Sequence, residues 1–249
     1  MNILDKIVSK KRKRVDEAKS QVSIEDIQNQ LAEIPFLRSN FKKSLENQEQ
    51  SIIAEIKRAS PSAGIIAKDF NPILKAQEYE SMGAKALSIL TEEDFFQGSN
   101  KVLQEVKKVT NLPILRKDFI IDDYQIYESK LLGADCILLI TSILSDRQIE
   151  EYVSKAEEIN LDVLIEVHDE EELSRISKFQ NVLVGVNNRN LKTFEVDLMN
   201  SVRLRKNYIG DQIFIAESGI KSNEDIKYLV SNDINVFLIG ESLMRGKFF

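Results

Sequence analysis

The chain has 249 residues, of which 43% are hydrophobic and 30% charged, and its formal net charge is −6. A chain of this size can bury a full hydrophobic core, and its negative charge gives no reason to expect nucleic acid or an anionic membrane as a partner. We find no apolar run of about 18 residues and expect no signal peptide. Because Cys136 is the one cysteine, a disulfide framework is excluded and the reducing cytoplasm is the expected compartment.

The first 48 residues have a polar, helical pattern and precede the first predicted strand, so we expect a helical extension of the main architecture. The apolar stripe of the first predicted helix consists of Ile3, Leu4, Ile7, Val8 and Val15. Ser23 and Asp26 have the spacing of a helix-start box for a second helix. Pro35 ends that helix, and the apolar residues Phe36, Leu37, Phe41 and Leu45 predict another.

A basic run covers Lys10 to Arg14 in the first predicted helix. Such a run can bind nucleic acid, but in a chain that is acidic as a whole it is more often a solvated helix face. We therefore interpret it as a solvated face and expect no nucleic-acid partner.

From residue 51 onward, short apolar runs alternate with amphipathic helical patterns. The apolar runs typical of buried strands are residues 52–56, 86–90, 112–115, 136–140, 163–167, 182–186, 213–216 and 236–239. The helical patterns between them are residues 72–82, 99–109, 123–132, 146–159, 170–178, 197–206 and 223–231. Gly83 and Gly133 supply the left-handed residue with which a helix often ends before the next strand.

This alternation predicts right-handed crossovers, a parallel sheet and an α/β fold, a (β/α)8 TIM barrel. A doubly wound open sheet is the alternative, but no Gly-rich dinucleotide fingerprint follows the first strand. We expect one domain over residues 1–249, with the extension in 1–48 and the barrel in 49–249. Only residues 241–249 follow the last strand, so the closing helix should be very short or missing.

Charged side chains follow the apolar strands, where barrel enzymes place their sites. Glu55 and Lys57 are two residues apart in a strand and therefore share a face; a buried structural ion pair is the alternative reading. Lys117, Glu166 and Glu217 stand at other strand ends. A lysine that donates a proton near neutral pH needs burial or a cationic neighbour to lower its pKa, and two lysines in one pocket could supply this.

The last two strand ends suggest a phosphate site, because the loops after strands 7 and 8 hold phosphate in many barrels. Ser218-Gly219 and Gly240-Glu241 can present backbone N–H groups to an anion; the alternative is that the glycines only make tight turns. Phe96, Phe119 and Leu191 could form an apolar wall for an aromatic ring. We expect no metal, because His168 is the one histidine and no ligand set completes it. We interpret His168 as a turn or helix-entry residue and Cys136 as core packing.

Together these motifs resemble the indole-3-glycerol phosphate synthase family of tryptophan biosynthesis. The resemblance spans nearly the whole chain and rests on residues 53–62 (IAEIKRASPS), 91–99 (TEEDFFQGS), 115–120 (LRKDFI), 164–167 (LIEV), 185–191 (GVNNRNL), 216–220 (AESGI) and 238–244 (LIGESLM). In that family the helical extension covers the mouth of the barrel. The short C-terminus departs from the family, whose chains usually continue through a final helix.

The resemblance implies a decarboxylating and dehydrating ring closure of 1-(2-carboxyphenylamino)-1-deoxyribulose 5-phosphate without a cofactor. It implies catalytic roles for Glu55, Lys57, Lys117, Glu166, Asn187 and Ser218. It implies substrate contacts from Ser60, Pro61, Phe96, Phe119, Leu138, Arg189, Leu191 and Glu217. It implies phosphate contacts from Lys57, Ser218, Gly219, Gly240 and Glu241. We expect a cytoplasmic monomer that binds a phosphorylated small molecule, with no nucleic-acid or membrane partner.

Two other functions stay open on the sequence alone. The first is another phospho-sugar barrel enzyme, an isomerase or epimerase; those enzymes rely on Asp or Cys pairs or on metal ligands, whereas these strand ends offer mostly Glu and Lys. The second is a barrel that binds phosphate without catalysis.

Overall fold

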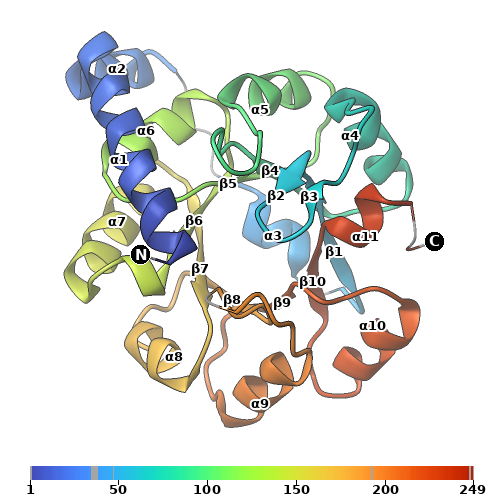
Figure 1. Ribbon diagram of the computed structural model, residues 1–249. Helices are drawn as coiled ribbons and strands as arrows, with labels where there is room; N and C mark the ends of the chain where they lie inside the picture. Colours follow the sequence, from blue (N-terminus) through green and yellow to red (C-terminus); the bar gives the residue numbers. More distant parts are fainter. Residues whose placement is uncertain (1, 35–38, 47, 192, 247, 249) are drawn as a thin grey trace.

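The computed structural model describes residues 2–34, 39–46, 48–191, 193–246 and 248. In this part of the chain, eight parallel strands close into a barrel in the order β1-β10-β9-β8-β7-β6-β5-β4, with helices around it (Figure 1). The strands are β1 (Ser51–Ile56), β4 (Ala86–Leu90), β5 (Ile114–Lys117), β6 (Cys136–Ile140), β7 (Asp162–Val167), β8 (Leu183–Asn187), β9 (Phe214–Glu217) and β10 (Val236–Ile239). The predicted TIM barrel is confirmed, and the open doubly wound sheet is excluded.

The outer layer is built from helices that connect successive strands. They are α4 (Pro72–Ser81), α5 (Asn100–Lys107), α6 (Tyr124–Leu131), α7 (Asp146–Glu158), α8 (Glu170–Ile176), α9 (Met199–Asn207) and α10 (Asn223–Val230), with the short 3-10 helix η1 (Thr141–Ile143) before α7. Side-chain caps fix several helix starts; Ser145 and Ser222, for example, each accept a backbone N–H in a reciprocal capping box. These caps satisfy backbone donors that the first helical turn leaves unpaired.

Alternate strand residues divide the core into an inner and an outer cluster. On β7, Leu164 belongs to the cluster inside the barrel, whereas Val163 and Ile165 belong to the cluster between the strands and the helices. Because side chains alternate along a strand, apolar residues are needed on both faces, which explains the continuous apolar runs in the sequence.

Several strands end later in the chain than predicted. β5 begins at Ile114 and ends at Lys117, whereas the prediction covers residues 112–115. Pro113 has no N–H to donate to a neighbouring strand, so pairing starts after it. β8 and β9 are likewise shifted and end at Asn187 and Glu217. These polar side chains are therefore held by the barrel itself and not by loops.

The N-terminal extension runs from one end of the barrel to the other. It comprises α1 (Ile3–Gln21), α2 (Ile24–Ala32) and α3 (Phe41–Leu45). Phe41 and Leu45 of α3 are buried in the inner cluster, and the Ser39 hydroxyl donates to Asp162 at the start of β7. Thus α3 closes the end of the barrel opposite the strand exits, while α1 lies on the side of α6 and α7 (Figure 1). The predictions made for Pro35, Phe36 and Leu37 lie outside the described residues.

The basic run of α1 is only partly solvated. Lys11 is 7% exposed and forms an ion pair with Asp118 just after β5, and Arg14 binds Asp94 in the loop after β4. The interpretation of a solvated helix face is therefore wrong for Lys11, because the side of α1 that faces the barrel meets acidic strand exits. It holds for Arg12 and Lys13, which are exposed.

The chain end covers the seam between β10 and β1 with little helix. The helix α11 (Glu241–Met244) has one turn, in agreement with the very short closing helix that the sequence predicts. Leu243, Met244 and Phe248 are buried in the outer cluster, and the Tyr79 hydroxyl of α4 donates to the Met244 sulfur at 3.3 Å. These apolar side chains extend the outer cluster beyond the last strand.

Candidate active site

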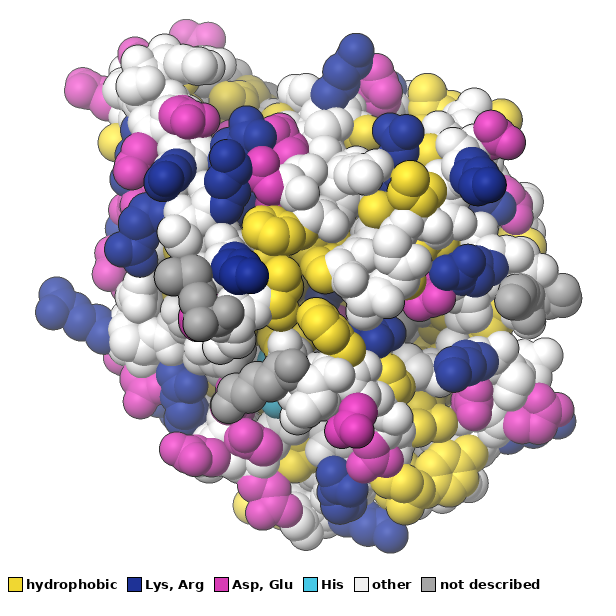
Figure 2. Space-filling view, viewed as in Figure 1, with side chains coloured by type: hydrophobic (Ala, Val, Ile, Leu, Met, Phe, Trp, Pro, Cys, Tyr) yellow, Lys and Arg dark blue, Asp and Glu magenta, His cyan; other side chains and the backbone are white. Residues whose placement is uncertain are grey.

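A cavity of about 720 Å³ opens at the carboxyl ends of the strands, a volume within the range of small-molecule sites. Figure 2 looks onto this face and shows a hollow near its centre, bordered by hydrophobic and basic side chains. The structure brings every residue predicted for the site to this one lining: Glu55, Lys57, Ser60, Pro61, Phe96, Lys117, Phe119, Leu138, Glu166, Asn187, Arg189, Leu191, Glu217, Ser218, Gly219, Gly240 and Glu241. Their roles remain proposals.

The polar residues converge because they occupy equivalent places at the strand ends. Lys117, Asn187 and Glu217 are the last residues of their strands, and Glu55 and Glu166 are the last but one. In a closed parallel barrel these positions form one rim, so side chains from distant parts of the sequence face each other.

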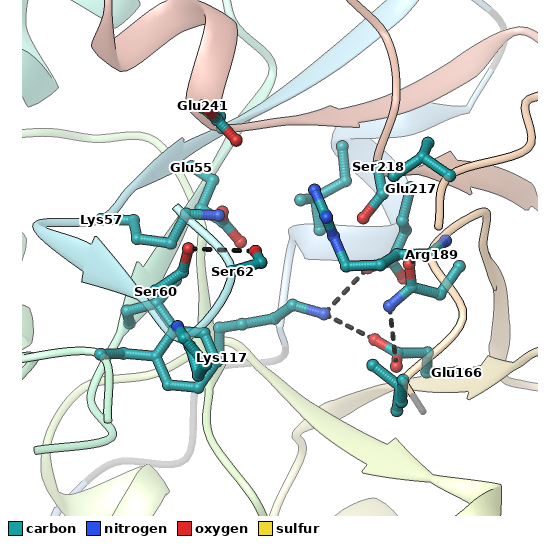
Figure 3. A pocket seen from close by; sticks show the side chains of 18 of the residues that line it. Glu55, Lys57, Ser60, Ser62, Lys117, Glu166, Arg189, Glu217, Ser218 and Glu241 are labelled. Carbon is teal, nitrogen blue, oxygen red and sulfur yellow. Dashed lines mark hydrogen bonds and ion pairs between the residues drawn. The ribbon is translucent and has the colours of Figure 1, made fainter. Parts of the chain in front are cut away.

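Lys117 lies between two carboxylates at the centre of the cavity. Its Nζ is 2.8 Å from Glu166 Oε2 and 2.8 Å from Glu217 Oε2, and Figure 3 shows the lysine side chain reaching across to both. The Asn187 amide donates to Glu166 Oε1 at 3.1 Å. Both glutamates are buried, at 2% exposure, so these charges interact in a medium that screens them weakly.

The expected lowering of a lysine pKa is wrong for Lys117. Burial opposes its charge, but the attraction of Glu166, Glu217 and Glu55 outweighs burial and raises the pKa of Lys117 well above its usual range. Lys57 is not the neighbour that could reverse this, because its Nζ pairs with Glu55. Lys117 is therefore an ammonium at neutral pH, with its protons directed at the carboxylates.

The two carboxylates on Lys117 differ in their proton affinity. For Glu166, burial is outweighed by the cations Lys117 and His168, which hold its pKa well below the usual range. For Glu217, burial and the negative charges of Glu166 and Glu55 outweigh Lys117 and raise its pKa to about 7. The site thus holds one firmly ionised carboxylate and one that exchanges a proton near neutral pH.

Glu55 and Lys57 form a second acid–base couple beside the first. They share one face of the chain at the end of β1, and Lys57 Nζ pairs with Glu55 Oε1. A side chain at position 240 would overlap with Glu55 Oε1, so Gly240 is what lets this carboxylate approach the end of β10. Gly185 leaves room for Glu217 Oε1 in the same way. Both glycines admit a buried carboxylate into a crowded rim.

Apolar side chains line part of the cavity opposite these charges. The rings of Phe96 and Phe119 lie 6.0 Å apart between centroids at an angle of 40°, and Leu138 of β6 is buried in the inner cluster. The Glu92 carboxylate accepts the backbone N–H groups of Phe95 and Phe96 at 2.7 and 3.0 Å. Glu92 thus shapes the loop that carries Phe96.

The loops after β9 and β10 line the cavity. After β9, Ser218 and Gly219 have φ angles of 65° and 85°, so the chain bends there through the left-handed region that glycine favours. Two cations that the sequence reasoning missed, Lys221 and Arg245, line the cavity beside these loops. Their position after the predicted phosphate loops was the signal that could have indicated them.

The sequence reasoning also missed apolar residues of α1 in the cavity lining, Ile3, Leu4 and Ile7. The family resemblance implied that the extension covers the barrel mouth, but only the fold shows which residues of the stripe line the cavity. It also missed that His168 lies against the site: its Nε2 is 3.4 Å from Glu166 Oε1. Its spacing of two residues from Glu166 was the available signal.

The described residues show neither a membrane-spanning helix nor a metal-binding cluster. No helix among them is long and apolar enough to span a membrane. Nor does any group of three or more His, Cys, Asp or Glu side chains among them have the arrangement of a metal site.

Comparison with known proteins decides the family. The model of the indole-3-glycerol phosphate synthase family matches residues 4–248. The chain belongs to this family. The indole-3-glycerol phosphate synthase of Acinetobacter baylyi is 47% identical over 244 residues, covering 98% of this chain and 91% of that protein. The synthase of Clostridium acetobutylicum is 46% identical over 244 residues, covering 98% and 93%.

Two solved structures share the fold of the family at low sequence identity. The tryptophan synthase alpha subunit of Legionella pneumophila superposes with a TM-score of 0.62 at 12% identity, covering 84% of this chain and 88% of that one. The N-acetylmannosamine-6-phosphate 2-epimerase of Clostridium perfringens gives a TM-score of 0.57 at 15% identity, covering 79% and 88%. These likenesses concern the barrel alone.

Proposed function

We propose that this cavity converts 1-(2-carboxyphenylamino)-1-deoxyribulose 5-phosphate to indole-3-glycerol phosphate, as an indole-3-glycerol phosphate synthase and carboxy-lyase of tryptophan biosynthesis. In this reaction an aromatic carbon attacks the ribulose carbonyl, then carbon dioxide and water leave. None of these steps changes the overall oxidation state, so we propose that no redox cofactor takes part. The observation that carries the proposal is the ammonium of Lys117, held between Glu166 and Glu217 in a cavity with an apolar wall.

Lys117 is proposed as the general acid of ring closure. An ammonium held by two buried carboxylates can pass a proton to the carbonyl or hydroxyl oxygen of a bound substrate and be restored by a neighbouring carboxyl group. Glu166 would orient that oxygen and share its proton, and Asn187 fixes the Glu166 carboxylate through its amide. Glu217, with a pKa of about 7, suits temporary storage of a proton.

Glu55 and Lys57 are proposed for the later steps. Glu55 is the candidate base for the later proton loss that accompanies dehydration and completes the aromatic indole, because its carboxylate lines the cavity. Lys57 can give positive charge to the substrate carboxylate or phosphate and can act as acid in the dehydration. Lys57 and Lys117 are both candidates for the acid that protonates the leaving hydroxyl.

The remaining predicted residues are proposed to hold the substrate. Phe96, Phe119, Leu138 and Leu191 would contact the aromatic ring, since these apolar side chains line the same cavity as the charges. Asn187 and Arg189 would hold its polar and carboxylate groups, and Ser60 and Pro61 would also contact the substrate. The phosphate would lie at the loops after β9 and β10, against Ser218, Gly219, Gly240, the backbone of Glu241, and Lys57.

Conversion of the aminodeoxyribulose phosphate tests the function directly. The chain contains no Trp, so indole fluorescence from the product rises from a low background. We expect an increase in fluorescence that depends on enzyme concentration and is matched by release of one carbon dioxide per indole. Binding of the substrate with neither signal would favour a non-catalytic phosphate-binding barrel, and isomerisation of a phospho-sugar would favour the other rival.

We also propose that the protein acts as a monomer in the cytoplasm. All residues assigned to the reaction come from one chain, and the thiol of Cys136 is buried and unpaired with another cysteine, as suits a reducing compartment. Light scattering of the purified protein tests the first point, and fractionation of cells that express it tests the second.

A further inference from the structure

His168 is a partly buried, titratable side chain that the proposed mechanism leaves unused. It directly follows β7, two residues after Glu166, and its side chain is 15% exposed. Asp169 caps α8 by accepting the N–H of Glu172 at 2.9 Å. This short turn places the imidazole between a carboxylate of the cavity and a carboxylate of α8.

Glu172 folds back from α8 to hold the histidine. Its Oε2 accepts the His168 backbone N–H at 2.8 Å and the Thr141 hydroxyl at 2.7 Å, and lies 3.0 Å from His168 Nδ1. Hydrogen bonds to this oxygen favour the ionised carboxylate and, with the charge of His168, outweigh burial and lower the pKa of Glu172. The outer side of the ring is thus fixed against a negative charge.

The inner side of the ring faces a second negative charge. His168 Nε2 is 3.4 Å from Glu166 Oε1, and among the described residues it has no hydrogen-bond partner although it is buried. A neutral imidazole has one N–H, so one of its nitrogens would turn a lone pair toward a carboxylate. Only the imidazolium presents a proton to both Glu166 and Glu172.

This arrangement separates the two carboxylates on Lys117. Glu166 has a cation at each oxygen, Lys117 at Oε2 and His168 at Oε1. Glu217 has Lys117 at Oε2, and its buried Oε1 has no hydrogen-bond partner among the described residues. Without His168, Glu166 would keep Lys117 and the Asn187 amide but lose its second cation, so the difference between the two glutamates would shrink.

We propose that His168 is a positively charged positioning residue that directs the negative charge onto Glu166, so that Glu217 is the carboxyl group that takes up a proton beside Lys117. The turnover test of this proposal rests on the proposed function, whereas the test of the charge on His168 does not. The opposite pKa shifts of Glu166 and Glu217 agree with it. The pKa of His168 agrees too: burial disfavours the imidazolium, but the carboxylates of Glu166 and Glu172 outweigh burial and raise the pKa to about 10.

The groups around the ring that bear on its titration come from several elements. Among the described residues, the charged neighbours are Glu166 of β7 and Glu172 of α8. The uncharged polar groups are Thr141 of η1, Asn187 of β8 and Asn200 of α9. Beyond Glu166 lie the charged Lys117 of β5 and Glu217 of β9.

NMR titration of the imidazole tests the charge without any substrate. Because His168 is the one histidine, its ring signal in an untagged protein is unambiguous. We expect it to remain that of an imidazolium from pH 6 to about 8.5, and in Glu172→Gln to titrate at a pKa lower by about one unit or more, since one anion is removed. The control variant Glu171→Gln removes the same charge from an exposed position on α8 and should leave the pKa of His168 unchanged. A wild-type ring that is neutral at pH 7 would overturn the proposal.

The pH dependence of turnover tests the effect on Glu166. In His168→Gln, Glu166 loses one of its two cations and competes with Glu217 for the proton held beside Lys117, so we expect the pH profile of kcat/KM near neutral pH to differ from that of the wild type; an unchanged profile would overturn the proposal. Should this variant fail to fold, Glu172→Gln decides: its kcat should fall at alkaline pH in step with the NMR titration of His168, and a mismatch between the two would overturn the proposal. Absence of wild-type turnover would overturn the proposed function instead and would leave the NMR result standing.

Discussion

Lys11 and Asp118 form an ion pair that joins helix α1 of the N-terminal extension to the carboxyl end of β5 at the barrel rim. Lys11 Nζ lies 2.7 Å from Asp118 Oδ1, and the two side chains are only 9% and 1% exposed. Asp118 also accepts the hydroxyl of Thr91 at 2.6 Å and directly follows Lys117. The helix that closes one side of the cavity is therefore fastened to the residue beside the proposed acid.

Removal of this lysine should destabilise the protein and weaken substrate binding. Lys11→Met leaves the Asp118 carboxylate buried without its nearest cation, a change that costs about 3 kcal/mol of unfolding free energy. Because α1 also supplies Ile3, Leu4 and Ile7 to the cavity, KM should rise more than kcat falls. Urea unfolding and steady-state kinetics measure the two effects.

Lys10 provides the matched control for Lys11. Its side chain is 47% exposed, and its Nζ is 3.8 Å from Asp94, so Lys10→Met should cost less than about 1 kcal/mol. Equal losses in the two variants would show that burial of the Lys11–Asp118 pair does not matter.

Lys117 can be tested separately as a charge and as a proton donor. Lys117→Ala should lower kcat by a factor of roughly 10² or more, the worth of a positioned general acid. It also leaves Glu166 and Glu217 without their shared cation, so lost activity could follow from lost stability. Lys117→Arg keeps a charge for both carboxylates, but its rigid planar guanidinium cannot place a donated proton where the lysine ammonium places it. We expect near-wild-type unfolding and a low kcat for the arginine variant; wild-type kcat would remove Lys117 as the acid.

Much of the fold and the site lining follows from local patterns in the sequence. Apolar runs of strand length separated by helical periods predict a barrel, and a parallel barrel brings all strand exits to one rim. That is why Glu55, Lys117 and Glu166, taken from separate strands, share one cavity. To place a residue at the site, the prediction needs the face of the strand on which it lies and the approximate end of that strand. The alternation of side chains gives the face, and the end of the apolar run gives the approximate strand end.

Features that depend on contacts between distant segments could not be predicted. The burial of Lys11 depends on Asp118, and the plug at the far end of the barrel depends on Phe41 reaching the inner cluster. The sign of the Lys117 pKa shift depends on which carboxylates contact its ammonium, and the sequence shows only that carboxylates and lysines are both present. Local spacing thus places residues on the rim, but only packing pairs them.

Gly240 should be required because of its closeness to Glu55. A methyl group at this position would overlap with Glu55 Oε1, so Gly240→Ala should displace the carboxylate and lower kcat/KM by roughly 10². Gly83, which precedes β4 at the other end of the barrel, is the control: its φ is +86° and the space around it is open. Gly83→Ala should cost about 1 kcal/mol of stability through backbone strain and leave kcat/KM unchanged. Equal kinetic effects would show that the overlap with Glu55 is relieved elsewhere.

Glu217 should make the stability of the protein depend on pH near neutrality. Its pKa is raised from 4.5 to about 7 by burial and by neighbouring carboxylates. Between these values the folded protein holds a proton that the unfolded chain has released, so the contribution of Glu217 to stability is full below pH 4.5 and is lost as pH rises to about 7. Glu217→Gln has no proton to lose, so its advantage over the wild type should grow across this interval.

Urea unfolding at pH 5, 6, 7 and 8 measures this difference. Most other titrating groups are common to both proteins, so the change in the difference with pH isolates position 217 and the groups it contacts. We expect the free energy of unfolding of Glu217→Gln to gain on that of the wild type from pH 5 to 7 and then to level off. A constant difference would mean that Glu217 is already ionised in the folded protein at pH 5. A group other than Glu217 would then have to take up the proton beside Lys117.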